Sequence, residues 1–153
     1  MTVQQAAAVL PVKLISVRVG EQLFALDIGV LREIRGWSTS TPLPQAPAYV
    51  LGMINLRGQV LPVLDLALRL GLAPSQPDAS SVVVVAELGG RTVGLLVSAV
   101  CDIINVAPDR VQAAPDLGSP GRSAFVQGVI TLGDEIVTYL DLHAALPETG
   151  LAA

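Results

Sequence analysis

The chain has 153 residues, 52% of them hydrophobic and 14% charged, which excludes intrinsic disorder and suffices for one compact domain or two very small ones. The formal net charge of −4 disfavours binding to phosphate backbones, and every apolar stretch is interrupted before the roughly 18 residues that a membrane span needs. A single cysteine, Cys101, and a single histidine, His143, exclude intramolecular disulfides and cysteine- or histidine-rich metal sites.

The first predicted elements are short strands joined by glycine-containing turns. Residues 12–19 and 23–28 flank the turn at 20–22 and predict a hairpin. Residues 82–88 and 92–97 flank a Gly-Gly-Arg turn and predict a second hairpin. The second pair is almost continuously apolar, which is typical of strands buried on both faces.

Helical periodicity is scarce in the rest of the chain. It covers about two turns within residues 64–72 and about one turn within 143–146, where Pro147 follows. The 14 glycines and 11 prolines interrupt short runs of Val, Ile and Leu. We therefore predict an all-β fold built from small barrels, with a short C-terminal helix.

The chain also repeats itself. A shift of 76 positions aligns seven identical residues within the 17 positions from 50 to 66, and a shift of 70 aligns the two predicted hairpins. The identical pairs at the first shift are Val50 and Val126, Gly52 and Gly128, Ile54 and Ile130, Leu56 and Leu132, Leu64 and Leu140, Asp65 and Asp141, and Leu66 and Leu142. Two copies of one β unit are predicted, roughly 13–72 and 81–146, joined by the linker-like segment 73–80 and packed together with a groove between them.

Candidate catalytic residues lack the context that chemistry requires. Cys101, His143 and a nearby aspartate, Asp102 or Asp141, have no activating sequence around them. We expect Cys101 to be a small buried residue and His143 a partly exposed residue of a C-terminal turn. Asp65 and Asp141 are predicted to accept backbone N–H groups where a strand enters the next turn. Neither G-x-G-x-x-G nor a Walker A motif is present.

One stretch of sequence carries a family resemblance. It reads Glu-Ile-Arg-Gly at 33–36, Gly-Met-Ile-Asn-Leu-Arg-Gly at 52–58 and Leu-Pro-Val-Leu-Asp-Leu at 61–66. The pattern closely resembles the CheW family of chemotaxis coupling proteins, and the likeness continues through 88–94 and 97–104, covering about 14–146. The resemblance implies a CheW-like domain at 13–147, made of the two units intertwined, with flexible segments at 1–12 and 148–153.

The resemblance implies a fold and a role. The implied fold is two SH3-like five-stranded β-barrels with a hydrophobic groove between them, which agrees with the internal repeat. The implied role is a non-catalytic adaptor, without a cofactor, that couples the cytoplasmic tips of methyl-accepting chemoreceptors to the regulatory domain of the histidine kinase CheA. A helical hairpin of the receptor is expected to bind in the groove.

The resemblance also assigns residues to surfaces. The receptor-binding residues that it implies are Ile28, Leu31, Glu33, Arg57, Val82 and Gly94. The kinase-binding surface that it implies lies on the first barrel at 18–26 and 43–50, with Phe24, Leu43 and Val50. The implied structural motif consists of Asn55, Leu56, Gly58 and Asp65. Arg57 is expected to pair with Glu33, the alternative being two independent solvated charges.

Other roles remain open at this stage. A CheW-like adaptor of a pathway unrelated to motility has the same sequence features. An SH3-like or Sm-like module that binds peptide or RNA is a third possibility, which the acidic charge balance and the small number of aromatic residues disfavour. The first ten residues lack the basic region of a secretory signal, which predicts a cytoplasmic protein without membrane insertion. The resemblance implies that it is recruited to chemoreceptor arrays.

Overall fold

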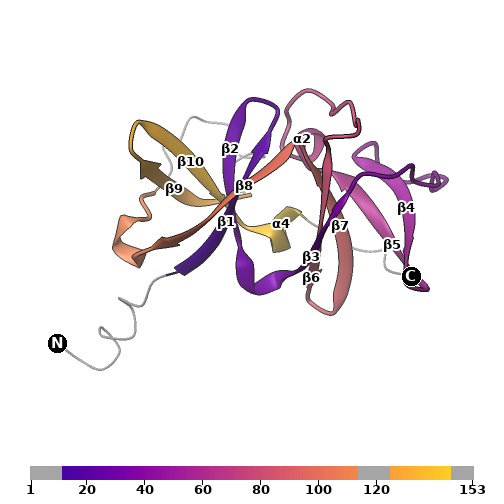
Figure 1. Ribbon diagram of the computed structural model, residues 1–153, viewed down its shortest axis with the longest axis horizontal. Helices are drawn as coiled ribbons and strands as arrows, with labels where there is room; N and C mark the ends of the chain where they lie inside the picture. Colours follow the sequence, from indigo (N-terminus) through magenta and orange to yellow (C-terminus); the bar gives the residue numbers. More distant parts are fainter. Residues whose placement is uncertain (1–11, 114–124, 146–153) are drawn as a thin grey trace.

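A computed structural model describes residues 12–113 and 125–145 of the chain, which form two five-stranded β-sheets lying side by side (Figure 1). The first sheet has the strand order β8 (Ala99–Val106), β1 (Val12–Val19), β2 (Gln22–Asp27), β10 (Glu135–Leu140) and β9 (Val126–Leu132). The second sheet has the order β3 (Leu31–Gly36), β6 (Val82–Leu88), β7 (Arg91–Val97), β5 (Gln59–Asp65) and β4 (Val50–Leu56). The predicted all-β class with two β subdomains is confirmed.

The described residues contain four short helical segments, three of which lie between strands, while α4 follows the last strand. They are η1 (Ile28–Val30), α2 (Leu66–Arg69), η2 (Pro108–Arg110) and α4 (Leu142–Ala145). The longer helix predicted at 64–72 is reduced to α2, because Leu64 and Asp65 still belong to strand β5. Nowhere in the described part of the chain is a helix both long enough and apolar enough for a membrane crossing.

The two sheets are interleaved along the sequence. Strands β1 and β2 from the first half pair with β8, β9 and β10 from the second half, whereas β3, β4 and β5 pair with β6 and β7. In each sheet, strands from the two halves of the chain are joined by one short parallel pairing, which is β2 with β10 in the first sheet and β5 with β7 in the second. Each repeat of hairpin, single strand and hairpin is therefore divided between the sheets, and neither sheet corresponds to 13–72 or 81–146.

The largest apolar core lies between the sheets. It contains 17 buried residues drawn from both, whereas the interior of the second sheet has six and that of the first has five. Strand β6 shows how one strand serves two cores: Val83 and Val85 face the interior of the second sheet, while Val84 and Ala86 face the shared core. This explains the almost continuous apolar runs of the sequence, because both faces of these strands are buried.

Each sheet closes on itself through the chain that follows its edge strand. After β3, Thr41 exchanges backbone hydrogen bonds with Met53 of β4, at 2.8 and 2.6 Å. After β8, Gln112 does the same with Val129 of β9, at 2.9 and 2.8 Å. A Cβ atom on Gly52 would lie 2.4 Å from the Thr41 carbonyl oxygen, and one on Gly128 would lie 2.6 Å from that of Gln112. The repeated glycine thus permits the close approach that completes each barrel.

An arginine sits between two aromatic rings that are equivalent in the repeat. The guanidinium carbon of Arg69 lies 4.5 Å from the ring centroid of Tyr49 and 4.7 Å from that of Phe125. These two residues are separated by 76 positions and precede β4 and β9, one strand in each sheet. The stacked cation therefore links the two sheets at their junction.

Candidate functional site

The predicted pair of Glu33 and Arg57 is formed. Arg57 Nη2 lies 2.5 Å from Glu33 Oε1, and Arg57 Nη1 donates a second, longer hydrogen bond of 3.5 Å to Oε2. Glu33 is on β3 and Arg57 is in the turn between β4 and β5, so the pair joins the two opposite edges of the second sheet. Its two-point geometry fixes the direction of the guanidinium group as well as its distance.

The pair is accessible to a partner. The side chain of Arg57 is 73% exposed and that of Glu33 is 26% exposed. The hydrogen bond from Arg57 lowers the pKa of the Glu33 carboxyl group, and the charge of Arg35 lowers it further. The same contact raises the pKa of Arg57. Both groups are therefore charged across the neutral range, and an incoming partner meets an ion pair rather than two separate charges.

The backbone of the turn positions Arg57. Leu56 and Gln59 pair across the hairpin, and the two residues between them, Arg57 and Gly58, have φ angles of 50° and 88°. Positive φ at both central residues is the requirement of the tight type I′ hairpin turn. The Asn55 side chain accepts a hydrogen bond of 2.8 Å from the Gly58 N–H. The Asn-Leu-Arg-Gly motif therefore forms a tight turn that places Arg57 at the tip of the β4–β5 hairpin.

Further charges extend this surface along β3. Arg35 lies 3.8 Å from Glu33, and Arg32 makes an ion pair of 2.7 Å with Glu87 of the neighbouring strand β6. Ile34 is 48% exposed and lies on the opposite face of β3 from Glu33 and Arg35, the face that it shares with its cross-strand partner Val84. We call Arg32, Glu33, Ile34, Arg35 and Arg57 the β3 surface. The interaction between Arg32 and Glu87 was not predicted from sequence, although the antiparallel pairing of β3 with β6 carries the two side chains to the same end of the sheet.

The other predicted receptor-binding residues are not all at the surface. Ile28, the first residue of η1, and Leu31, the first residue of β3, are half-buried. The Asp27 side chain caps η1 by accepting the Gly29 N–H. Val82 is half-buried at the opposite end of β6, next to Gly36. Gly94 is buried, and a Cβ atom there would lie 2.8 Å from Val83 Cγ1. Gly94 therefore supports this surface from inside the sheet.

The residues predicted to bind the kinase lie on both sheets. Phe24 is on β2 of the first sheet and only 5% exposed, so it is a residue of the shared core rather than of a contact surface. Leu43 and Val50 are half-buried and belong to the chain leading into β4 of the second sheet. The stretches 18–26 and 43–50 are thus divided between the two sheets and do not form one face of one barrel.

The residues of the predicted structural motif make defined contacts. Leu56 is buried in the second sheet. Asp65 is 1% exposed and accepts bonds from both the N–H and the hydroxyl group of Ser75, at 2.9 and 2.6 Å. Asp141 accepts the N–H of His143 at 3.0 Å. The two repeated aspartates therefore hold the chain that follows strands β5 and β10, although Asp65 reaches ten residues ahead rather than into the next turn.

The two candidate reactive side chains, those of Cys101 and His143, are both exposed. Cys101 is exposed, contrary to the expectation of burial, because its strand β8 is an edge strand bonded only to β1. His143 is exposed on α4, as expected. Within residues 12–113 and 125–145 there is no cluster of three or more His, Cys, Asp or Glu side chains that is suited to a metal ion.

The junction between the sheets is mostly filled by the shared core. A cleft of about 210 Å³ opens beside it, between the β1–β2 turn, the end of β7 and the segment that follows α2. Ser75, Ser81 and Ser98 line it together with Ala67, Ala73 and Pro74. Its lining is mixed rather than hydrophobic, in contrast to the groove that was expected.

Comparisons with known proteins agree with the fold and the motif. The CheW-like domain model matches residues 13–149. The chain is 44% identical to chemotaxis protein CheW of Rhizobium meliloti (strain 1021), over 88% of this chain and 87% of that protein. It is 43% identical to a probable chemotaxis protein CheW of Rhizobium etli, over 90% and 88%. The structure of the scaffolding protein TtCheW from Thermoanaerobacter tengcongensis superposes with a TM-score of 0.83, at 28% identity, covering 94% of this chain and 98% of that one.

Proposed function

The chain belongs to the CheW-like domain family, and from this premise we propose that it is a non-catalytic adaptor that couples chemoreceptors to the histidine kinase CheA in chemotaxis. The observation that carries the proposal is the match to a protein named chemotaxis protein CheW, at 44% identity over 88% of the chain. An adaptor acts by holding its partners in a fixed geometry, so we propose that it is cytoplasmic and is recruited to receptor arrays.

The β3 surface is the best-defined candidate for contact with a partner. It carries the oriented pair of Glu33 and Arg57 on one face of β3 and the exposed apolar side chain of Ile34 on the other. A partner that contacts this edge strand would meet both charged and apolar groups. We assign this surface to the receptor, with Ile28, Leu31 and Val82 completing it and Gly94 supporting it from beneath.

A second surface is required for the kinase. Leu43 and Val50 are half-buried, and we propose that they contact the regulatory domain of CheA. Phe24 contributes indirectly, because it packs in the core beneath. Receptor and kinase would then bind at separate places on one rigid body, and the receptor would shift the kinase between active and inactive states.

The proposal is tested with kinase autophosphorylation in a mixture of receptor fragment, CheA and this chain. We expect activity to respond to the receptor only when the chain is present. Arg57→Glu and Glu33→Arg should each weaken coupling, and the double exchange should restore it in part, because it re-forms the pair. Arg110→Ala is the matched control, since Arg110 is an exposed arginine on η2, away from the β3 surface.

Co-sedimentation with each partner separates the two surfaces. Loss of receptor binding alone in the Arg57→Glu variant supports the assignment above, whereas loss of kinase binding alone reverses it. A chain that binds neither partner refutes the adaptor proposal, and the family membership then accounts for the fold alone.

A further inference from the structure

The parallel pairing that joins β2 to β10 is short, and a pocket lies next to it. Only Thr138 with Phe24 and Tyr139 with Ala25 are paired. Gln22 and Leu23 pair with β1 alone, and Glu135, Ile136 and Val137 pair with β9 alone. Each strand end therefore has one side of its backbone without a neighbouring strand. Unpaired backbone of this kind is a template for an added strand.

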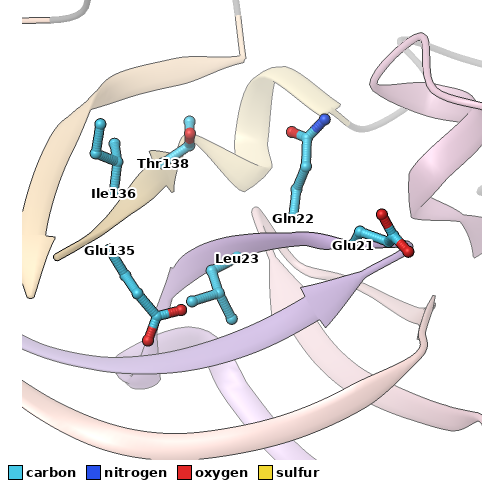
Figure 2. Close-up of a pocket in the computed structure, with 6 residues that line it drawn as sticks. All are labelled: Glu21, Gln22, Leu23, Glu135, Ile136 and Thr138. Carbon is cyan, nitrogen blue, oxygen red and sulfur yellow. The ribbon is translucent and has the colours of Figure 1, made fainter.

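The pocket has a volume of about 370 Å³ and is lined from both strand ends. Its lining consists of Glu21, Gln22, Leu23, Glu135, Ile136 and Thr138 (Figure 2). The carboxylates of Glu21 and Glu135 lie on opposite sides in Figure 2, with Leu23 between them and Thr138 beside Ile136. The volume is within the range of pockets that bind ligands or short peptide segments.

The pocket is both acidic and apolar. Ile136 is 65% exposed, the largest exposed fraction among the bulky apolar side chains of the described residues. Neither Glu21 nor Glu135 forms an ion pair with another residue in 12–113 or 125–145. Two carboxylates without a cation beside an exposed isoleucine fit a partner that carries positive charges next to an apolar side chain.

Comparison with the equivalent positions of the second sheet shows that the acidity is not a consequence of the fold. The repeat aligns Glu21 with Arg91, and Glu135 with Gln59. The exposed apolar position is shared, because Val60, the counterpart of Ile136, is 61% exposed. The strand ends are also unpaired in the second sheet, where the β5–β7 pairing begins only at Val63 and Gly94. Negative charge at this place is therefore what distinguishes the first sheet.

We infer that this pocket binds an extended, cationic segment of a partner protein by strand addition, at a site separate from the β3 surface. Backbone hydrogen bonds to the free sides of β2 and β10 would supply affinity, and Glu21 and Glu135 would select for Lys or Arg. The inference goes beyond the adaptor proposal and does not depend on it, since neither receptor nor kinase takes part in the test.

The probe is an acetylated and amidated hexapeptide of alternating valine and lysine, titrated into the full chain and followed by amide NMR spectra. We expect saturable shifts at Gln22, Leu23 and Ile136, with a Kd at or below about 1 mM. The double variant Glu21→Gln/Glu135→Gln should weaken binding by about tenfold and retain the spectrum of the folded chain. Asp109→Asn, which removes an exposed carboxylate on η2, should bind as the unmodified chain does.

Two further peptides test the mode of binding. A peptide of alternating valine and glutamate should not bind, and a backbone N-methylated valine-lysine peptide should lose binding because it cannot donate to a strand. Equal binding of either peptide overturns the inference, as do shifts confined to β3. Absence of saturation also overturns it, and the two glutamates then serve only to protect the strand ends from aggregation.

Discussion

Barrel closure offers a sharp test of how this fold is built, because the two closing bridges depend on one repeated glycine. Gly52→Ala places a Cβ atom 2.4 Å from the Thr41 carbonyl oxygen, at a φ of 152°. Gly128→Ala places one 2.6 Å from the Gln112 carbonyl oxygen, with no unusual φ. Real Cβ atoms do not approach backbone so closely, so the closing segment must move in each variant.

The expected cost follows from what each variant loses. Displacing the segment breaks the two backbone hydrogen bonds of a bridge, each contributing about 0.5–1.5 kcal/mol. We therefore expect Gly128→Ala to lower the free energy of unfolding by about 1–3 kcal/mol. Gly52→Ala adds strain at a φ that side chains rarely adopt, which brings the expected loss to about 2–5 kcal/mol.

The chain supplies two matched controls. Gly58 has a φ of 88° and open space around the added Cβ, so Gly58→Ala isolates the conformational strain, about 1–2 kcal/mol. Gly36 has open space and no positive φ, so Gly36→Ala should be neutral or stabilising by up to about 1 kcal/mol. Urea denaturation of the four variants, compared at equal m-value, measures all four differences.

Two results would refute the reasoning. If Gly128→Ala unfolds at the same urea concentration as Gly36→Ala, the close approach of Gln112 does not contribute to stability. If Gly52→Ala costs no more than Gly58→Ala, the strain at φ accounts for its effect and the bridge does not. Either outcome means that the sheets do not need closure to be stable.

Three other predictions concern single side chains. Arg69→Ala should lower the free energy of unfolding by about 1–2 kcal/mol in urea, because it removes two cation–π contacts, and Arg69→Lys should recover part of this. In the Arg57→Ala variant, the pKa of Glu33 should rise toward 4.5, as measured by a carboxyl NMR titration. In the unmodified chain, the pair's contribution to the free energy of unfolding is present above pH 4.5 and is lost as the pH falls through the lowered pKa of Glu33. Burial, together with the charges of Asp27 and Asp141, raises the pKa of Tyr139 above 10.0. Its phenolate absorbance should therefore develop at a higher pH than that of an exposed tyrosine, and the free energy of unfolding should fall as the pH rises through this range. The Tyr139→Phe variant should lack this absorbance step.

The local structure could be read from the sequence, because its signals are local. Glycine turns between apolar runs identify both predicted hairpins, and strands β1 and β6 have the predicted bounds. The pairing of hairpins could not be read in the same way. The repeat shows that two units exist, but aligning the sequence with itself does not show which unit supplies the neighbour of each strand. The interleaving depends on short parallel contacts between distant residues, such as Val63 with Gly94.

The same limit explains which site residues were predicted well. Glu33 and Arg57 have opposite charges in a recognisable motif, and the structure joins them. The family resemblance implies a surface role for Phe24, but a resemblance does not specify which face of a strand is buried, and β2 lies between two cores, so Phe24 is inside. Cys101 was assigned to the interior because an edge strand does not differ in composition from a central one. The acidic pocket was missed because its two halves are more than a hundred residues apart.

The shared core has a consequence for any protein that must hold partners in position. The β3 surface belongs to the second sheet and the acidic pocket to the first, and both sheets pack on the same 17 buried residues. A substitution in that core, such as Phe24→Ala, should therefore change both surfaces and the stability together, because it leaves a cavity between the sheets. Substitutions at Arg57 or Glu135 should leave stability almost unchanged and affect one surface only. The interleaved strands make the relative orientation of the two surfaces a property of the core, so a signal passed between partners does not require the sheets to move against each other.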